Sequence, residues 1–273
     1  MTKKFGIIGD PIQHSLSPVL HNYWFKKYEI DANYSIIETK EENLPDVINK
    51  IKSGDLKGIN ITLPYKQKIV PYLDVLINDA EITSSVNTIY LDNNGTIVGE
   101  NTDVFGLQAA YLKEVDDISR KNALIIGAGG VSPSVILSLK KSGVKEISII
   151  NRTIEKCIFL KKKFSNLKIK EWNNLKNEIA NYDIIINATS LGLKHGKDFS
   201  FNFETTKKNL IFIDTIYNPL ETKTLRYLKE KYLKVFNGLD MFIYQGQKAF
   251  YLWNKINPEI DQKLIDILLS KLK

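Results

Sequence analysis

The chain has 273 residues, which exceeds the roughly 100–150 residues of one ordinary domain and predicts two lobes. With 43% hydrophobic and 25% charged residues, its composition excludes a disordered chain and predicts a globular protein with a sizeable core. The net charge of +7 raises the question of nucleic-acid binding, but the lysines are spread along helix-like stretches such as 156–163 and 223–234. Solvated helix faces, and no nucleic-acid partner, are therefore expected.

The amino terminus shows no export signal, because lysines lead directly into a short strand-like run that ends at Gly9 and Pro11. No window approaches the roughly 18–20 consecutive apolar residues of a membrane span. The single cysteine, Cys157, has no partner for an internal disulfide. These features predict a cytoplasmic protein that does not associate with membranes.

Strand-like runs alternate with amphipathic stretches in the first part of the chain, which predicts βαβ units. The predicted strands are 5–9, 34–38 and 58–63, and the predicted helices are 17–28 and 43–53. A hairpin follows, because the runs 86–91 and 96–98 flank Asn93-Asn94-Gly95, where asparagine and glycine accept positive φ angles. The first lobe is predicted to reach Asp103.

A second series of strands and helices follows a helical pattern that begins at Val104. The predicted strands are 122–127, 146–151, 183–188 and 210–216, and the predicted helices are 131–142 and 153–164. Apolar strands that alternate with amphipathic helices are typical of a doubly wound parallel sheet. The stretch 240–273 predicts two helices, broken at Asn257-Pro258, that return to the first lobe. The sequence thus predicts an α/β protein with two domains, 1–103 plus 240–273 and 104–239.

A glycine-rich turn follows the strand at 122–127. Gly127 permits a tight turn, Gly129 lets the backbone approach a phosphate, and the helix start beyond them would direct its amides at a pyrophosphate. Ser132 occupies the third position of the fingerprint in place of glycine or alanine, and Pro133 suits a first helical turn. The pattern favours a dinucleotide site, with an ordinary glycine turn as the alternative.

The next strand ends at Asn151-Arg152-Thr153, at the position where an acidic residue would select NAD. The guanidinium of Arg152, aided by Lys156 one helical turn later, suits a 2′-phosphate and therefore favours NADP. Only three arginines occur among 38 basic residues, and a bidentate phosphate contact is where arginine is hardest to replace. The alternative is a solvated arginine beside a helix N-cap at Thr153.

Polar residues follow one strand of the first lobe. Strand alternation places Asn60 and Thr62 on one face and the apolar residues on the other, namely Ile59, Ile61 and Leu63. Lys66 lies just beyond the proline that ends this strand. By its position alone Lys66 is a solvated lysine, and Asp103 is the cap of the helix that follows it. A catalytic role for either residue therefore depends on the surrounding motifs.

Short motifs are distributed along the whole chain. They are Ser15-Leu16-Ser17, Asn60-Ile61-Thr62-Leu63-Pro64-Tyr65-Lys66, Val86-Asn87-Thr88, Gly99-Glu100-Asn101-Thr102-Asp103, Gly127-Ala128-Gly129-Gly130, Asn151-Arg152-Thr153, Asn187-Ala188-Thr189-Ser190-Leu191-Gly192, Tyr217-Asn218-Pro219 and Gln245. Several are weak individually, but in this order and together they resemble the shikimate dehydrogenase family closely. The resemblance implies an NADP-dependent oxidoreductase that reversibly reduces 3-dehydroshikimate to shikimate, on the route to chorismate and the aromatic amino acids.

The resemblance also implies an active-site cleft between a substrate-binding lobe and an NADP-binding lobe, and it implies no metal. The implied substrate-binding residues are Ser15, Ser17, Asn60, Thr62, Lys66, Asn87, Asp103, Tyr217 and Gln245. The implied cofactor-binding residues are Gly127, Ala128, Gly129, Gly130, Val131, Asn151, Arg152, Thr153, Lys156, Thr189, Ser190 and Gly238. Within this set, Lys66 is the implied proton donor to the developing alkoxide and Asp103 its partner.

The chain departs from the commonest family pattern after the glycine turn, at Asp240 and at Gln247-Lys248, without loss of a proposed catalytic group. One alternative is a quinate/shikimate dehydrogenase with relaxed substrate or NAD use, and another is a non-catalytic NADP-sensing module. Arg152 argues against NAD use, and the presence of both Lys66 and Asp103 argues against a sensor. The histidines, His14, His21 and His195, are expected to have local structural roles. Both a monomer and a homodimer are compatible with the sequence.

Overall fold

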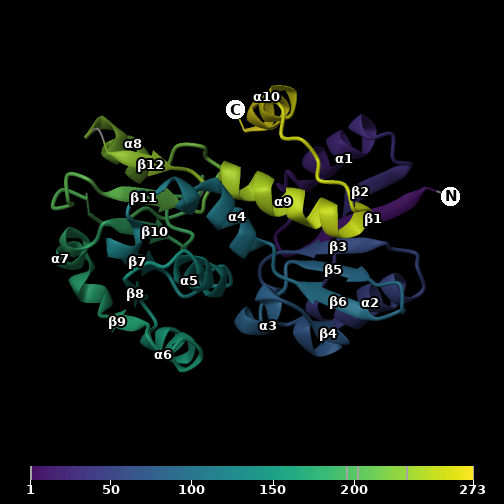
Figure 1. The fold of residues 1–273 in the computed structure, drawn as a ribbon, viewed down its shortest axis with the longest axis horizontal. Coiled ribbons are helices and arrows are strands. Elements are labelled where there is room, and N and C mark those ends of the chain that lie inside the picture. Colours follow the sequence, from purple (N-terminus) through teal and green to yellow (C-terminus); the bar gives the residue numbers. More distant parts are fainter. Residues whose placement is uncertain (1, 195, 202, 232, 273) are drawn as a thin grey trace. The chain divides into compact units, whose positions relative to one another are not determined.

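The computed structural model describes residues 2–194, 196–201, 203–231 and 233–272. They divide into two compact units, one formed by Met1–Gly106 with Ile243–Lys273 and the other by Leu107–Phe242. Each unit is built on its own six-stranded sheet, as Figure 1 shows. The predicted α/β class with two lobes is therefore confirmed. His195 lies outside the described residues.

The first unit has a mixed sheet in the order β2-β1-β3-β5-β6-β4. Its strands are β1 Lys3–Ile8, β2 Ala32–Ile36, β3 Gly58–Ile61, β4 Val75–Leu76, β5 Thr88–Leu91 and β6 Ile97–Glu100. Its helices are α1 Ser17–Lys27, α2 Leu44–Lys52, α3 Asp79–Thr83 and α10 Gln262–Lys271, with the 3₁₀ turns η1 Glu41–Asn43 and η2 Val70–Tyr72. The chain leaves this unit within α4, Asp103–Ala110, and returns to it within α9, Leu239–Asn254.

Helix α2 covers one face of the first sheet because its apolar residues recur at helical spacing. Val47 and Ile51 of α2 belong to the same buried cluster as Ile59 of β3 and Ile89 of β5. The prediction that Leu63 joins this face is wrong. Leu63 is 55% exposed because β3 ends at Ile61 and Leu63 lies within a turn, in which the amide of Tyr65 donates to Thr62 O.

An aromatic cluster ties the carboxyl-terminal segment to the first unit. The ring of Phe5, on β1, lies 5.1 Å from the rings of both Phe25 on α1 and Trp253 on α9. Phe250 on α9 lies 5.3 Å from Phe25. The predicted pair of carboxyl-terminal helices is present and packs on this unit.

His21 is fully buried within this aromatic cluster. Its ring stacks on Tyr34 at 4.5 Å, and among the described residues neither ring nitrogen has a hydrogen-bond partner. Burial lowers the pKa of His21 from 6.5 to about 3. The nearby side chain of Asn60 opposes this shift only in part, because it is too poorly placed to form a hydrogen bond with the ring. His21 therefore has a structural role, as expected from the sequence, and remains neutral in the folded state.

Replacing His21 by phenylalanine is expected to make folding less sensitive to acid. The unfolded chain binds a proton at this histidine below pH 6.5 and the folded chain does not until about pH 3, so the wild type loses stability as the pH falls through that range. The free energy of unfolding of the wild type should fall relative to His21→Phe by up to about 1.4 kcal/mol per pH unit. Urea unfolding between about pH 4 and pH 7, followed by tryptophan fluorescence, measures this difference. A constant difference across the range would contradict it.

The second unit has an entirely parallel sheet in the order β12-β11-β10-β7-β8-β9. Its strands are β7 Asn122–Ile126, β8 Glu146–Ile150, β9 Lys168–Lys170, β10 Ile184–Asn187, β11 Ile211–Asp214 and β12 Lys234–Phe236. Its helices are α5 Ser132–Lys141, α6 Ile154–Lys163, α7 Leu175–Glu178 and α8 Lys223–Glu230, with the 3₁₀ turns η3 Leu112–Glu114, η4 Ile118–Arg120, η5 Trp172–Asn174 and η6 Ile179–Asn181. The chain order changes direction at β7, so the carboxyl ends of β7 and β10 form the topological switch point, where such sheets bind ligands.

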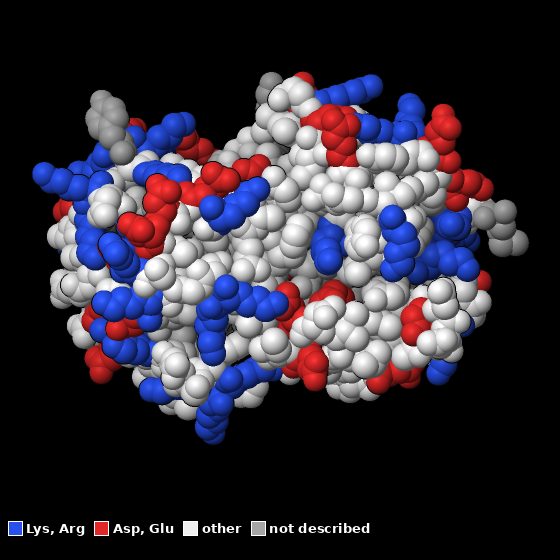
Figure 2. Space-filling view, in the orientation of Figure 1, with Lys and Arg blue, Asp and Glu red and all other residues white. Residues whose placement is uncertain are grey.

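The charged side chains are mixed on the face of the protein seen in Figure 2, where lysine and arginine are interspersed with aspartate and glutamate. Among the described residues, no helix is both long enough and apolar enough to cross a membrane. In that same part of the chain, no three histidine, cysteine, aspartate or glutamate side chains gather as metal ligands would.

Candidate active site

A buried ion pair joins the two predicted catalytic residues in the first unit. The Nζ atom of Lys66 lies 2.6 Å from Oδ2 of Asp103, and the two residues are 8% and 5% exposed. Lys66 follows the turn after β3, and Asp103 opens α4 three residues after the end of β6. The strands β3 and β6 lie on either side of β5 in the sheet. A solvated lysine is thereby excluded. Asp103 does begin a helix, but its carboxylate binds the lysine.

Asn87 connects this ion pair to the other polar residues. Its Nδ2 lies 2.8 Å from Oδ1 of Asp103, 3.0 Å from Oγ1 of Thr102 and 3.3 Å from Oε1 of Gln245. Its Oδ1 accepts a hydrogen bond from the backbone amide of Thr102. The structure therefore brings together four of the predicted residues, Lys66, Asn87, Asp103 and Gln245, in one hydrogen-bonded group.

Asn60 lies beside this group, and its side-chain amide bonds to the protein while its Oδ1 can accept one further hydrogen bond. Its Nδ2 donates to Asn87 O at 3.0 Å and to Thr88 Oγ1 at 3.1 Å, and its Oδ1 accepts from the hydroxyl of Tyr34. The amide thus locks β3 to the start of β5. Thr62 is half-buried just beyond the strand, with its methyl group against Gly9.

The two predicted carboxylate-binding serines lie at the start of α1. The backbone amide of Ser17 donates to Oγ of Ser15 at 3.2 Å, and the first turn of this 11-residue helix contains no acidic residue. Backbone amides and the helix dipole favour an anion at such an end. His14, which the sequence places next to these serines, is exposed.

In the second unit, the glycine turn links β7 to α5. Gly127 has φ +112°, and a Cβ there would lie 2.7 Å from Ala188 O and from Thr189 Cγ2, so only glycine fits. A Cβ on Gly129 would meet only Ala188 O, at 3.9 Å, which leaves open space beside this backbone. The turn is therefore tightly packed at Gly127 and leaves room beside Gly129 for a pyrophosphate to approach the backbone.

The remaining residues of the turn lead into α5 and into the next strand end. Val131 is the N-cap residue of α5, and a proline occupies its first turn as predicted. The backbone amide of Ala128 donates to Oδ1 of Asn151 at 3.1 Å, and Nδ2 of Asn151 donates to Thr153 O at 2.8 Å. Asn151 thus fixes the glycine turn against the segment that carries Arg152.

Arg152 lines a shallow hollow of about 280 Å³ at the carboxyl ends of β8 and β9. The hollow is bounded by Asn151, Arg152, Ile154, Lys170, Glu171, Trp172 and Asn173. Thr153 is the N-cap residue of α6, although its side chain makes no capping hydrogen bond, and Lys156 is exposed in the first turns of that helix. An exposed guanidinium beside a half-buried indole suits an adenosine 2′-phosphate.

The last predicted residues of the second unit lie at the carboxyl ends of β10, β11 and β12. The turn after β10 carries Thr189, whose backbone amide and hydroxyl both donate to Oδ1 of Asn187, and Ser190, which is exposed. Tyr217 follows β11, and its ring lies 4.9 Å from that of Phe242 in a tilted arrangement. A Cβ on Gly238 would lie 2.3 Å from Thr215 O, so its backbone packs directly on the loop that carries Tyr217.

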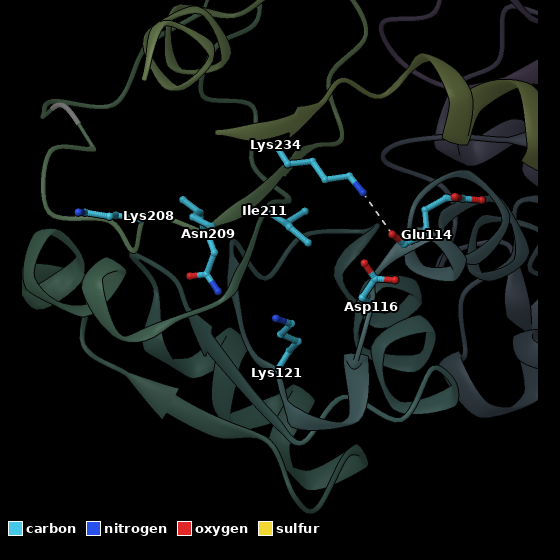
Figure 3. Close-up of a pocket in the computed structure, with 8 residues that line it drawn as sticks. Glu114, Asp116, Lys121, Lys208, Asn209, Ile211 and Lys234 are labelled. Atoms are coloured by element: carbon cyan, nitrogen blue, oxygen red, sulfur yellow. Dashed lines mark hydrogen bonds between the residues drawn. The ribbon is translucent and has the colours of Figure 1, made fainter. Parts of the chain in front are cut away.

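A second hollow, of about 300 Å³, is unrelated to these residues. It lies at the amino ends of β7, β11 and β12, the opposite edge of the sheet from the glycine turn, and three lysines and two acidic residues line it (Figure 3). Lys234 donates there to the backbone oxygen of Glu114. This hollow is not part of the dinucleotide site, because it lies at the amino ends of the strands and such sheets bind ligands at the carboxyl ends.

Two further polar residues of the second unit were given no role in the sequence prediction, although Asn187 begins one of the short motifs. Asn187 and Asp214 end β10 and β11, are fully buried, and bond to each other at 3.0 Å. The available signal was a polar residue at the end of an otherwise apolar strand. The fold, the glycine turn with Arg152, and the Lys66–Asp103 pair define a dinucleotide-dependent oxidoreductase of the two-unit α/β class.

The comparisons with known proteins agree on one family. The model described as the shikimate dehydrogenase substrate binding domain matches residues 7–89, and that described as shikimate / quinate 5-dehydrogenase matches residues 109–223. The chain is 46% identical to a shikimate dehydrogenase (NADP(+)) of Pelagibacter ubique, with 98% of this chain and 99% of the relative covered. The chain belongs to the shikimate dehydrogenase family.

Solved structures give the same result. A crystal structure of a shikimate dehydrogenase in complex with NADP⁺ has a TM-score of 0.91 and 35% identity, with 100% of this chain and 96% of that chain covered. The shikimate dehydrogenase of Thermus thermophilus in complex with NADP(H) and shikimate has a TM-score of 0.87 and 29% identity, with both chains fully covered.

Proposed function

We propose that this chain is a shikimate dehydrogenase that reversibly reduces 3-dehydroshikimate to shikimate with NADPH. The observation that carries the proposal is the buried pair of Lys66 and Asp103, 2.6 Å apart and surrounded by amide and hydroxyl groups. A buried ion pair that only stabilised the fold would not need amide and hydroxyl groups of several kinds beside it. A polyhydroxylated ring requires that set.

The proposed substrate site uses the polar group of the first unit. The substrate carboxylate would bind at the start of α1, where Ser15 and Ser17 supply hydroxyls and the helix supplies backbone amides. The ring hydroxyls would bind to side chains on and after β3, β5, β6 and α9, namely Asn60, Thr62, Lys66, Asn87, Asp103 and Gln245. Tyr217, on the loop after β11, is the remaining residue of the proposed set of substrate contacts.

Reduction of the ketone requires a hydride, which is the chemistry that NADPH supplies, and a proton. As negative charge develops on the carbonyl oxygen, Nζ of Lys66 donates its proton to that oxygen and becomes a neutral amine. Asp103 holds the lysine in place through Oδ2 and is itself held through Oδ1 by Asn87. In the reverse direction the amine of Lys66 accepts the proton of the shikimate hydroxyl.

The second unit would hold NADP by the groups that fit a pyrophosphate and a 2′-phosphate. Gly127, Ala128, Gly129, Gly130 and Val131 form the turn that would receive the pyrophosphate. Asn151, Arg152, Thr153 and Lys156 would surround the adenosine phosphate, and Thr189, Ser190 and Gly238 lie on the neighbouring strand ends. The open space beside Gly129 is the feature that supports the fit.

We also propose that the protein acts in the cytoplasm on these small molecules, as a monomer or homodimer and without a nucleic-acid partner. The single cysteine is unpaired and buried, and basic side chains are mixed with acidic ones on the face in Figure 2. A salt-sensitive affinity for DNA would contradict this proposal.

The activity is tested by incubating the purified protein with shikimate and NADP⁺ and measuring the products. We expect one 3-dehydroshikimate and one NADPH for each shikimate consumed, detected by chromatography and by the absorbance of the reduced nicotinamide. Formation of NADPH without 3-dehydroshikimate, or of neither product, would contradict the proposed reaction.

A further inference from the structure

Asp214 is a buried carboxylate at the carboxyl end of β11 that the proposed chemistry does not use. Its three hydrogen-bond donors are neutral: the amide of Ile216 at 3.1 Å, Nδ2 of Asn187 at 3.0 Å and Oγ1 of Thr222 at 3.0 Å. Burial raises the pKa of Asp214 to about 6, and the three donors oppose that rise. Burying a carboxylate among neutral donors costs free energy, so we expect its hydrogen bonds to be needed for the structure of the second unit.

The carboxylate of Asp214 is one of two acceptors that orient the side chain of Asn187, the other being the backbone oxygen of Leu191, which accepts from Nδ2 at 3.0 Å. An ionised carboxylate accepts hydrogen bonds and cannot donate them, so the Nδ2 end of Asn187 must face Asp214. The Oδ1 end then faces the turn after β10 and accepts from the amide of Thr189 at 3.1 Å and from its hydroxyl at 2.7 Å. If the side-chain amide of Asn187 were reversed, its Nδ2 group would face the amide of Thr189, and two hydrogen-bond donors would meet.

The orientation of Asn187 is transmitted to the glycine turn. Thr189 Cγ2 and Ala188 O would each lie 2.7 Å from a Cβ of Gly127, so the turn after β10 packs directly on the pyrophosphate turn. A shift of the turn after β10 would therefore move the wall of the proposed cofactor site.

The other two bonds of Asp214 fix the loop that carries Tyr217. Oδ1 holds the amide of Ile216, and Oδ2 holds the hydroxyl of Thr222, which also caps α8 by accepting from the amide of Leu225. The oxygen of Ile216 accepts in turn from the amide of Gly238 at 2.8 Å. One carboxylate thus anchors both ends of the loop between β11 and α8.

We propose that Asp214 is a positioning residue that aligns the cofactor-binding turn at Thr189 with the substrate-binding loop at Tyr217. The inference rests on the proposed function, since it takes Thr189 and Tyr217 as ligand contacts. Asp214 is fully buried and is not among the proposed ligand contacts. It acts through Asn187 on one side and through Ile216 and Thr222 on the other.

The test compares Asp214→Ala, Asp214→Asn and Thr222→Val with the wild type, using direct NADP binding and steady-state kinetics with shikimate. Asp214→Ala should bind NADP about tenfold more weakly and also raise KM for shikimate, because both segments lose their alignment. Asp214→Asn should stay within about threefold of the wild type, since its Oδ1 can still accept from Asn187 and Ile216 while its Nδ2 donates to Thr222. Thr222→Val should raise KM for shikimate while leaving the Kd of NADP nearly unchanged.

Asp183→Ala is the matched control for a purely structural effect. Asp183 ends the loop before β10, at the opposite edge of the same sheet, and its carboxylate accepts from the amide of Asn122 and from Lys207. This variant should lose thermal stability without a change in the Kd of NADP or in KM. The positioning role is overturned if Asp214→Ala alters only the melting temperature, as Asp183→Ala does. If Asp214→Ala does not fold, the same result for Thr222→Val overturns it. Because NADP binding is measured without turnover, this outcome is distinguishable from an inactive wild type, which would overturn the proposed function instead.

Discussion

Replacing Lys66 by alanine is expected to lower kcat for shikimate oxidation by about 10²–10⁴-fold, the range of a lost general acid or base. The affinity for NADP should remain nearly unchanged, because Lys66 belongs to the first unit and the proposed cofactor residues to the second. The alanine variant also leaves the buried carboxylate of Asp103 without its cation, which can cost about 3–5 kcal/mol of stability. Lys66→Met, which retains most of the apolar stem, should therefore be measured alongside it, with folding checked by circular dichroism.

Lys68→Ala is the control for this variant. Lys68 is two residues further along the chain, is largely exposed and pairs with Glu41 on the surface. Its loss should leave kcat nearly unchanged, since exposed ion pairs contribute little. A Lys66→Met variant that folds and keeps a near-normal kcat would contradict the assignment of Lys66 as proton donor.

The partner of Lys66 is tested by a double-mutant cycle. Asp103→Asn should also lower kcat, because it removes the anion that holds the ammonium group 2.6 Å away. If the pair acts as a unit, the double variant should be little slower than Lys66→Ala alone. Strict additivity of the two effects would show that the two residues contribute independently to kcat and would contradict a catalytic unit.

Replacing Arg152 by alanine is expected to weaken NADP binding by tenfold to a hundredfold, and NAD binding far less. The estimate corresponds to about 1.5–3 kcal/mol for the charge-assisted hydrogen bonds between a guanidinium and a phosphate. Arg152 lines the hollow after β8, so the fork of its side chain can meet two phosphate oxygens together. Titration of each variant with NADP and NAD gives the two dissociation constants.

Two variants separate this effect from a general loss of positive charge. Lys156→Ala should weaken NADP less than Arg152→Ala, because lysine is a mobile point charge that water can partly replace. Arg226→Ala removes an exposed arginine of α8 that pairs with Glu221, which precedes that helix, and it should leave both constants unchanged. An equal loss of NADP and NAD affinity in Arg152→Ala would remove the main physical support for NADP preference.

Elements with strong periodicity could be predicted from the sequence. The strands at β1, β3, β7, β8 and β10 and the helices α1, α2, α5 and α6 were placed within a few residues, because each has an apolar run or an amphipathic repeat long enough to recognise. The strands β4, β9 and β12 were missed, since each has two or three residues and no repeat. Leu63 was misplaced because alternation says nothing about where a strand stops.

The candidate site was predictable only in part. The glycine turn and Arg152 follow from local spacing, whereas Lys66 and Asp103 lie 37 residues apart and needed the resemblance to be paired. The internal hydrogen bonds of Asn60 and the network around Asp214 depend on partners from separate strands. No local pattern contains that information, because hydrogen-bond partners across a sheet are fixed by tertiary packing.

The most direct test of the account compares kcat/KM for shikimate and quinate, each paired with NADP and with NAD, followed by the absorbance of the reduced nicotinamide. The account predicts that shikimate with NADP gives the highest value, because Arg152 reads the 2′-phosphate and the polar group around Lys66 and Asp103 holds the shikimate ring. Equal or higher values with NAD would contradict the role of Arg152. A higher value with quinate would contradict shikimate as the substrate, and no turnover in any pairing would contradict the enzyme itself.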